Sequence, residues 1–345
     1  MNNTITIAGK EIQPGSIHEI KLKISEYYTA NPVYIPVVVI NGNEEGPRLF
    51  ITAALHGDEI NGIEIASQLI TSINPETLNG VIICVPIINI FGFYTMSRSM
   101  PDRRDLNETF PGSPKGSPAA RIAAILFEEV IQKCNYGIDI HTPRANRFEM
   151  PHIEADLNNR EAHQLARAFG TPLIINAYGP EKSLQNTATS SGIPTIVYSG
   201  GEILRFDEKT TEQGVTGIHN VLSHLEMADF ERKKPEFEII VQKSRSLRTQ
   251  TGGILYVHVK AGDLIYKGEL VARVTHPFGK DTEHITAPET GLIISASTTP
   301  LVNPGNEVYS YVILDKSLGI VEDTYRKNGH PSLVRNNNIV TGNQS

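Results

Sequence analysis

The sequence has few cysteines and no excess of positive charge, and each shortage excludes a class of protein. Two cysteines occur among 345 residues, Cys84 and Cys134, and both stand in apolar surroundings. We expect both to be buried free thiols, since they give little support for a disulfide or a cysteine metal site. The formal net charge of −7 and the pI near 5.9 argue against a nucleic-acid partner, which would favour a basic surface.

The sequence also has no long apolar run and no export signal. No stretch approaches the ~20 apolar residues that a membrane span needs. The N-terminal residues MNNTITIAGKEI lack a basic start followed by an apolar core, so we expect no signal peptide and no membrane partner. The remaining composition, with 39% hydrophobic and 20% charged residues, is typical of a globular cytoplasmic protein with one large domain or two ordinary ones.

Between residues ~45 and ~200, short apolar runs alternate with segments of helical spacing. The runs are rich in Ile and Val and bounded by Gly, Pro or Asn, as in strands buried on both faces; they are RLFITAAL, GVIICVPIIN, YGIDIH, PLIINAY and IPTIVYSG. Segments such as GIEIASQLITSI and SPAARIAAILFEEVIQK carry apolar residues at helical spacing. This alternation predicts an α/β domain over residues 1–240, with a mixed, mostly parallel central sheet flanked by helices.

Residues 241–335 consist of short alternating runs broken by glycine. The segments GGILYVHVKAGDLIYKGELVARV and TAPETGLIISASTTPLVNPGNEVYSYVIL predict consecutive hairpins and an all-β sandwich domain with pseudo-repeat symmetry. The first segment is similar to the biotinyl/lipoyl sandwich, but Lys260 and Lys267 stand at ordinary turns and not in the tripeptide of a carrier lysine. We therefore expect a structural or substrate-gating module, followed by a frayed tail over residues 336–345.

Ionisable residues stand at three of the predicted strand ends. His56 and Glu59 follow FITAAL, Asp139 and His141 end YGIDIH, and Glu202 follows IVYSGG. Because the carboxyl ends of parallel strands meet at one edge of a sheet, we expect these side chains to gather there. Burying them would be costly unless they are paired, hydrogen-bonded or bound to a metal.

The H-x-x-E spacing of His56 and Glu59 indicates a metal site. At the start of a helix, residues three apart share a face and can converge on one ion. Catalytic zinc commonly takes three protein ligands from His and Glu and leaves a position open. His141 is the best third ligand, and Asp139, on the same side of its strand, would orient the imidazole. The motif alone is common, so the prediction of one Zn²⁺ per chain rests on all three residues together.

With these residues identified, the chain resembles the succinylglutamate desuccinylase/aspartoacylase family, relatives of the zinc carboxypeptidases. The resemblance extends over nearly the whole chain and rests on four motifs: HGDE at 56–59, RDLN at 104–107, DIHT at 139–142 and SGGEILRFDE at 199–208. It implies a zinc carboxypeptidase-like α/β domain with a β-rich C-terminal domain. It also implies that His56, Glu59 and His141 bind zinc, and that Arg104 and Asn107 lie in the motif that binds the substrate.

One departure from the family pattern concerns substrate binding. The family usually reads D-L-N-R, whereas Glu108 follows Asn107 in this chain. An acid at that position would repel a substrate carboxylate, which favours a substrate with an amine or polar hydroxyls over an acylated acidic amino acid. Arg103, Arg144 and Arg147 are candidates to compensate.

A second departure concerns the general base, which the resemblance implies to be a glutamate. Relatives often carry it where this chain has Ser199. Glu202 is the next acid after that strand and is the expected base, with Glu208 as the alternative. The base would deprotonate the attacking water and then protonate the leaving amine.

The predicted function is therefore zinc-dependent hydrolysis of an amide bond in a small N-acyl amino acid or related acyl-amine. A zinc carboxypeptidase acting on peptides is a first alternative, although recognition of a C-terminus needs a cation and the arginine is missing. A non-catalytic binding protein that retains the fold is a second, suggested by Ser199 and Glu108. The sequence leaves open the identity of the acyl group and of the amine. It also leaves open the oligomeric state, for which a homo-oligomer is one option.

Overall fold

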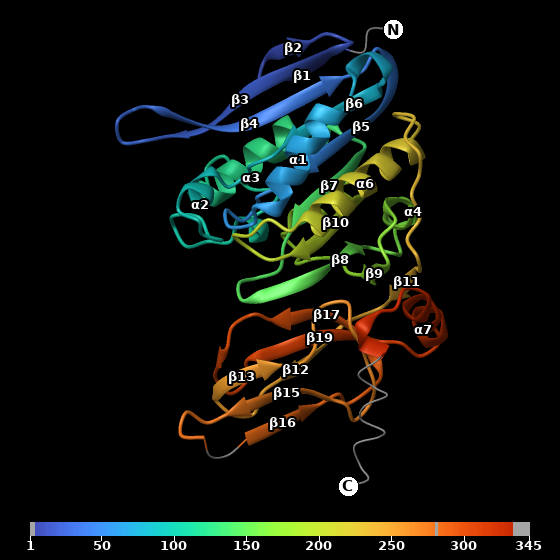
Figure 1. The fold of residues 1–345 in the computed structure, drawn as a ribbon. Helices are drawn as coiled ribbons and strands as arrows, with labels where there is room; N and C mark the ends of the chain where they lie inside the picture. The colour runs from blue at the N-terminus through green and yellow to red at the C-terminus, as the bar shows by residue number, and fades with distance from the viewer. Residues whose placement is uncertain (1–3, 280–281, 334–345) are drawn as a thin grey trace.

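The structure, a computed structural model, describes residues 4–279 and 282–333. Its largest sheet has parallel strands at its centre, in the order β10-β7-β5-β6 (Figure 1). These strands are β5 (Glu44–Thr52), β6 (Asn79–Val85), β7 (Tyr136–His141) and β10 (Thr195–Gly201). Each coincides with a predicted apolar run, and the mixed, mostly parallel sheet flanked by helices is confirmed.

Antiparallel strands extend the sheet on both sides of this centre. A long hairpin of β3 (Ser16–Glu26) and β4 (Pro32–Asn41) continues from β6. On the other side, β8 (Arg147–Ala155) pairs antiparallel with β10. The remaining strands of this region are β1 (Ile5–Ile7), β2 (Lys10–Ile12), β9 (Leu173–Asn176) and β11 (Ile239–Val241).

Helices cover both faces of the sheet, with α1, α4 and α6 packed together on one face (Figure 1). The helices are α1 (Asn61–Ser72), α2 (Ile90–Tyr94), α3 (Pro118–Glu129), α4 (Arg160–Phe169), α5 (Leu184–Ser190) and α6 (Glu208–His224). Short 3₁₀ turns are η1 (Pro75–Thr77), η2 (Leu106–Glu108) and η3 (Ile131–Lys133). Within the described part of the chain, every helix is too short or too polar to cross a bilayer.

Local sequence signals explain where several helices begin and end. Ser117 caps α3 by accepting a hydrogen bond from the N–H of Ala120, with Pro118 at the first helical position. Asn159 caps α4 in the same way, and Gly170 ends it in the left-handed conformation with a φ of 85°. The helices are thereby fixed relative to the strands that precede and follow them.

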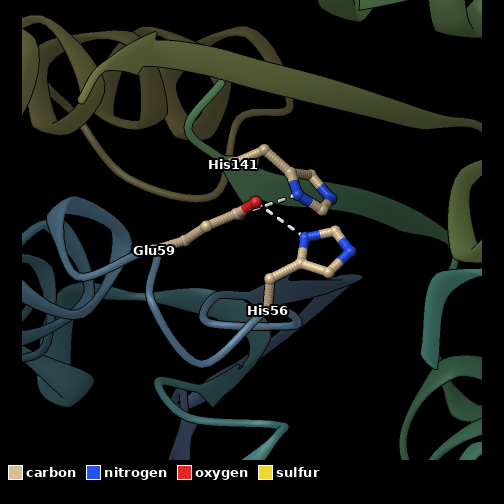
Figure 2. Close-up of side chains that lie close together, drawn as sticks. All are labelled: His56, Glu59 and His141. Carbon is tan, nitrogen blue, oxygen red and sulfur yellow. Dashed lines mark hydrogen bonds and ion pairs between the residues drawn. The ribbon is translucent and has the colours of Figure 1, made fainter. Parts of the chain in front are cut away.

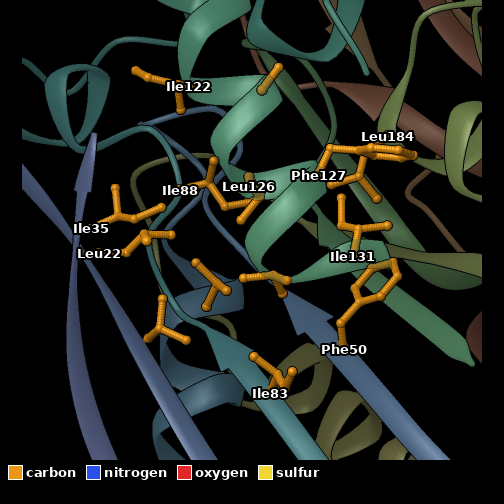
Figure 3. Close-up of a cluster of buried hydrophobic side chains, with 14 of the residues drawn as sticks. Leu22, Ile35, Phe50, Ile83, Ile88, Ile122, Leu126, Phe127, Ile131 and Leu184 are labelled. Carbon is orange, nitrogen blue, oxygen red and sulfur yellow. The ribbon is translucent and has the colours of Figure 1, made fainter. Parts of the chain in front are cut away.

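Two apolar cores lie on the two faces of the sheet. On one face, Phe50 of β5 and Ile83 of β6 pack with Leu126 of α3 (Figure 3). On the other, Ile138 of β7 packs in a cluster with Ile218 of α6. All five side chains are fully buried, and burial of such a side chain stabilises a fold by about 1.5–3 kcal/mol.

The C-terminal part forms the predicted β-sandwich. The sheet β16-β15-β13-β18 contributes Leu255 and Val271 to a core that β17 and β19 complete with Ile293 and Val308. The strands are β12 (Arg245–Arg248), β13 (Gly253–Val257), β14 (Leu264–Ile265), β15 (Leu270–Thr275), β16 (Thr282–Thr286), β17 (Gly291–Ser297), β18 (Leu301–Val302) and β19 (Glu307–Ile313).

The sandwich is joined to the α/β part by sheet hydrogen bonds, because β17 pairs antiparallel with β8. A helix that the sequence analysis did not predict, α7 (Leu318–Lys327), follows β19. The boundary proposed near residue 240 stays a prediction. The tail predicted over residues 336–345 lies outside the described residues.

Candidate metal centre

The turn that follows β5 carries the first two predicted ligands. Between Thr52 and the start of α1, the chain folds so that the N–H of Glu59 donates to the carbonyl of His56 at 3.1 Å. Gly57 lies between them and donates its N–H to the carbonyl of Ser97 at 3.1 Å. A Cβ on Gly57 would lie 1.9 Å from the carbonyl carbon of Gly92, so only glycine permits this close packing against α2.

Three side chains from two strand ends converge on one point (Figure 2). Nδ1 of His56 lies 2.6 Å from one oxygen of Glu59, and Nδ1 of His141 lies 2.9 Å from the other. Ligand atoms of the three residues all lie within 4.8 Å of one another. The side chains of His56, Glu59 and His141 are 2%, 1% and 11% exposed, so the group is largely buried and His141 is its most exposed member.

Two aspartates hold the opposite nitrogens of the two imidazoles. Nε2 of His56 lies 2.9 Å from Asp105, and Nε2 of His141 lies 2.8 Å from Asp139. The other oxygen of Asp139 accepts from the hydroxyl of Thr52 at 2.7 Å. A carboxylate can only accept, so each Nε2 donates its proton to an aspartate. Each Nδ1 faces the Glu59 carboxylate and would present a lone pair to a metal there once it has lost its own proton.

The charges of the group favour a bound cation. Although burial opposes ionisation, the two imidazoles lower the pKa of Glu59 from 4.5 to about 2. Burial likewise disfavours charged imidazoles, yet Asp139 and Glu59 raise the pKa of His141 well above its ordinary value. Glu59 therefore stays a carboxylate, and positive charge is favoured where the three side chains meet.

Arg98, which the sequence motifs did not indicate, completes the polar network. Its guanidinium lies 3.4 Å from Glu59 and donates to Asp105 from two nitrogens, at 3.2 and 2.9 Å. Although burial opposes it, hydrogen bonding to His56 and the charge of Arg98 hold the pKa of Asp105 below its ordinary value. The Arg98 side chain is 30% exposed, so part of it is open to a substrate.

The residues present fit a zinc ion. Two imidazole nitrogens and a carboxylate are the donor set of many catalytic zinc sites. Asp58 and Thr142 are next to Glu59 and His141 in the sequence, and their buried side-chain oxygens Oδ1 and Oγ1 have no hydrogen-bond partner among the described residues. Orphaned polar atoms are costly in a protein interior, so two of them on the segments that carry Glu59 and His141 agree with a polar group bound nearby.

The two predicted substrate-binding residues differ in their relation to this network. The side chain of Arg104 is 60% exposed and lies 3.6 Å from Asp102. Asn107 lies in η2, and its backbone N–H donates to the Asp105 side chain at 2.9 Å, while its side-chain oxygen accepts from the N–H of Leu184 at 2.9 Å. Asn107 thereby ties the η2 turn to the start of α5.

Glu108, which stands in place of the family's arginine, and the three arginines that were candidates to compensate lie at or near the surface. Glu108, Arg103 and Arg144 are exposed. Arg147 is half-buried and lies 2.8 Å from Glu307.

The two predicted bases make contacts elsewhere in the described structure. Glu202 follows β10 and accepts from the hydroxyl of Thr298 at 2.6 Å, and its other oxygen lies 3.8 Å from Arg205. Glu208 is an exposed residue in the first turn of α6. Neither carboxylate takes part in the hydrogen bonds described for His56, Glu59 and His141.

The orienting role of Asp139 leads to a testable expectation. In Asp139→Asn, an amide replaces the carboxylate that fixes the proton on Nε2, and the amide can donate to that nitrogen and reverse the tautomer. We expect zinc affinity to fall about 10–100-fold, measured by competition with a chromophoric chelator. Asp323→Asn, an exposed change on α7, is the matched control, and equal affinity in the two variants would contradict the assignment.

Three comparisons show which known proteins this chain is similar to. Residues 45–225 match the profile of the succinylglutamate desuccinylase/aspartoacylase catalytic domain. The chain is 29% identical over 287 residues to an N-alpha-acetyl-L-2,4-diaminobutyric acid deacetylase from Halomonas elongata, which covers 79% of this chain and 82% of the relative.

Solved structures share the fold. A succinylglutamate desuccinylase from Silicibacter sp. TM1040 superposes with a TM-score of 0.79 at 22% identity, covering 90% of this chain and 97% of that chain. The product-bound ectoine utilization protein EutE (DoeB) from Ruegeria pomeroyi superposes with a TM-score of 0.80 at 23% identity, covering 91% and 100%.

Proposed function

Because the chain belongs to the succinylglutamate desuccinylase/aspartoacylase family, we propose that it is a zinc-dependent deacylase with one Zn²⁺ per chain. It would hydrolyse the amide bond of a small N-acyl amino acid or a related acyl-amine. The observation that carries the proposal is the convergence of His56, Glu59 and His141, with Asp105 and Asp139 holding the far nitrogens.

The side chains have separate roles in this proposal. His56, Glu59 and His141 would hold zinc, which when bound supplies Lewis-acid polarisation of the amide carbonyl and acidifies a coordinated water. Arg98, partly exposed beside Glu59, would stabilise negative charge that develops on the carbonyl oxygen. A carboxylate on the same side would take the proton of the attacking water and pass it to the leaving nitrogen.

Charge supports a substrate that carries an amine. Glu108 is exposed at the end of η2, close along the chain to Asp105, and would attract a cationic group. The relative from Halomonas elongata is named for an acetylated diamino acid, whose second amine would be such a group. Arg104 and Asn107 stay the proposed contacts for the remainder of the substrate, and a cytoplasmic location stays a prediction.

A substrate panel tests the function directly. The zinc-loaded protein would be incubated with N-acetyl and N-succinyl derivatives of acidic, neutral and cationic amino acids, including Nα-acetyl-2,4-diaminobutyric acid, and free amine would be quantified. We expect turnover of the acylated cationic amino acids to exceed that of the acidic ones by at least about tenfold, about 1.4 kcal/mol. Metal analysis should give one zinc per chain.

The same panel, extended with short peptides, separates the alternatives. Release of C-terminal residues from short peptides without deacylation would indicate a carboxypeptidase. Zinc at full occupancy without turnover of any compound would indicate a binding protein. Full turnover by metal-free protein would contradict the zinc-dependent proposal itself.

A further inference from the structure

Strand β8 brings additional ionisable residues to the face of the sheet that carries His141. Ile138 and Ile140 of β7 point into the core beneath α1, α4 and α6, so Asp139 and His141 point to the opposite face. In the sheet register, Ser199 of β10 is paired with His141. Paired residues of adjacent strands point to the same face, and adjacent strands lie about 4.8 Å apart. Ser199 is therefore the immediate neighbour of a ligand.

Glu149 of β8 reaches this position from the other side of β10. The hydroxyl of Ser199 donates to a carboxylate oxygen of Glu149 at 2.7 Å. A carboxylate thus lies on the ligand-bearing face, joined to the residue beside His141.

A β-bulge explains why Glu149 points this way. Ser199 is paired with His152, and the register then shifts so that Gly201 is paired with Glu149. Residues 149 and 152 are three apart and would point to opposite faces of a regular strand. The extra residue of this bulge lies in β8, between Glu149 and His152, and bulges commonly redirect a side chain beside an active site.

The surroundings of Glu149 suit a proton acceptor. Burial raises the pKa of Glu149 above its ordinary value of 4.5, although His152 and the hydroxyl of Ser199 oppose the rise. A carboxylate whose pKa lies closer to neutrality is a better general base and a better general acid in the next step. Glu202, in contrast, is bound to Thr298 of the C-terminal sandwich.

We infer that Glu149, and not Glu202, is the catalytic carboxylate of the proposed deacylase. As the water oxygen bonds to the amide carbonyl carbon, one water proton passes to Glu149. The carbon–nitrogen bond then breaks, and Glu149 returns that proton to the leaving nitrogen. The products are a carboxylic acid and an amine, and the acid gives its proton to the amine in solution. Ser199 positions Glu149 for both transfers.

Two variants test this inference, which rests on the proposed function. In Glu149→Gln, we expect kcat on the best panel substrate to fall about 10²–10⁴-fold and KM to change less than about threefold. Zinc content and binding of the amine product by calorimetry should equal those of wild type. The matched control is Glu129→Gln. Glu129 lies at the end of α3, and its carboxylate accepts hydrogen bonds from Lys133 and from the N–H of Ala8.

The second variant exchanges the two partners, as Glu149→Ser with Ser199→Glu. It keeps the combined side-chain volume and places the carboxylate on β10 beside His141, so we expect recovery of at least about a tenth of wild-type kcat. Full activity of Glu149→Gln would overturn the inference. So would loss of zinc or product binding in that variant, or an inactive exchange variant that still binds zinc. An inactive zinc-loaded wild type would instead refute the proposed function.

Discussion

Replacing His141 with alanine is expected to abolish the proposed zinc binding and to lower turnover more than about 100-fold. Mutating a residue that only orients a metal ligand typically lowers metal affinity or activity about 10–100-fold. Removing the ligand itself should cost at least as much. The change also leaves Glu59 and Asp139, each about 1% exposed, without the imidazole that both contact. Metal content by plasma mass spectrometry and turnover of the panel substrate measure the two effects.

The appropriate control removes a histidine far from the site. His276 is exposed beside Phe278 in the C-terminal sandwich, so His276→Ala should retain both zinc and turnover. Wild-type protein treated with a chelator should lose activity and regain it when zinc is returned, whereas His141→Ala should not recover at equal zinc. Stoichiometric zinc and unchanged turnover in His141→Ala would refute the ligand assignment.

The strands that could be predicted from the sequence are those whose residues serve one purpose only, which is burial in the core. Strands β5, β7 and β10 are buried on both faces, so their apolar runs are continuous and easily recognised. The ends of β5 and β7 were then sufficient to predict that His56, Glu59 and His141 come together, which the structure shows.

Strand β8 was not predicted, because its sequence serves the sheet and the site at once. Glu149, His152 and Glu154 are polar residues on a strand in the middle of the sheet, and Pro151 stands between them. A proline and several charged residues normally argue against a central strand. Hydrogen bonds to neighbours such as Ser199 offset the cost of burying these polar side chains. Such partners are distant in the sequence, so a local sequence pattern does not reveal them.

Arg98 was missed for a different reason. Three arginines, Arg98, Arg103 and Arg104, lie within seven residues of the same loop, and spacing does not say which one points inward. The path of the loop decides it: Ser97 is bound to Gly57, and Arg103 adopts a left-handed φ of 63°. The spacing of the arginines reveals neither feature, so the contact of Arg98 with Glu59 could be found only in the folded structure.

Gly57→Ala is expected to damage the fold and the site together, although it adds a single methyl group. The new Cβ would lie 1.9 Å from the carbonyl carbon of Gly92 and 2.1 Å from the N of Phe93. Both are backbone atoms, so the turn must move as a whole. Overpacking of this kind costs about 1–3 kcal/mol, and displacement of a catalytic group by about 1 Å can cost 10²-fold in rate.

Gly319→Ala provides the matched control, because the same methyl group enters open space. Gly319 lies in the first turn of α7, and nothing stands within 4 Å of its added Cβ. Alanine should leave turnover unchanged and stabilise the helix by up to about 1 kcal/mol. Thermal melts and zinc titrations of both variants test the argument. Gly57→Ala could instead match wild type in melting temperature, zinc affinity and turnover. That result would show that the turn between His56 and Glu59 tolerates movement, and it would contradict the argument from close packing against α2.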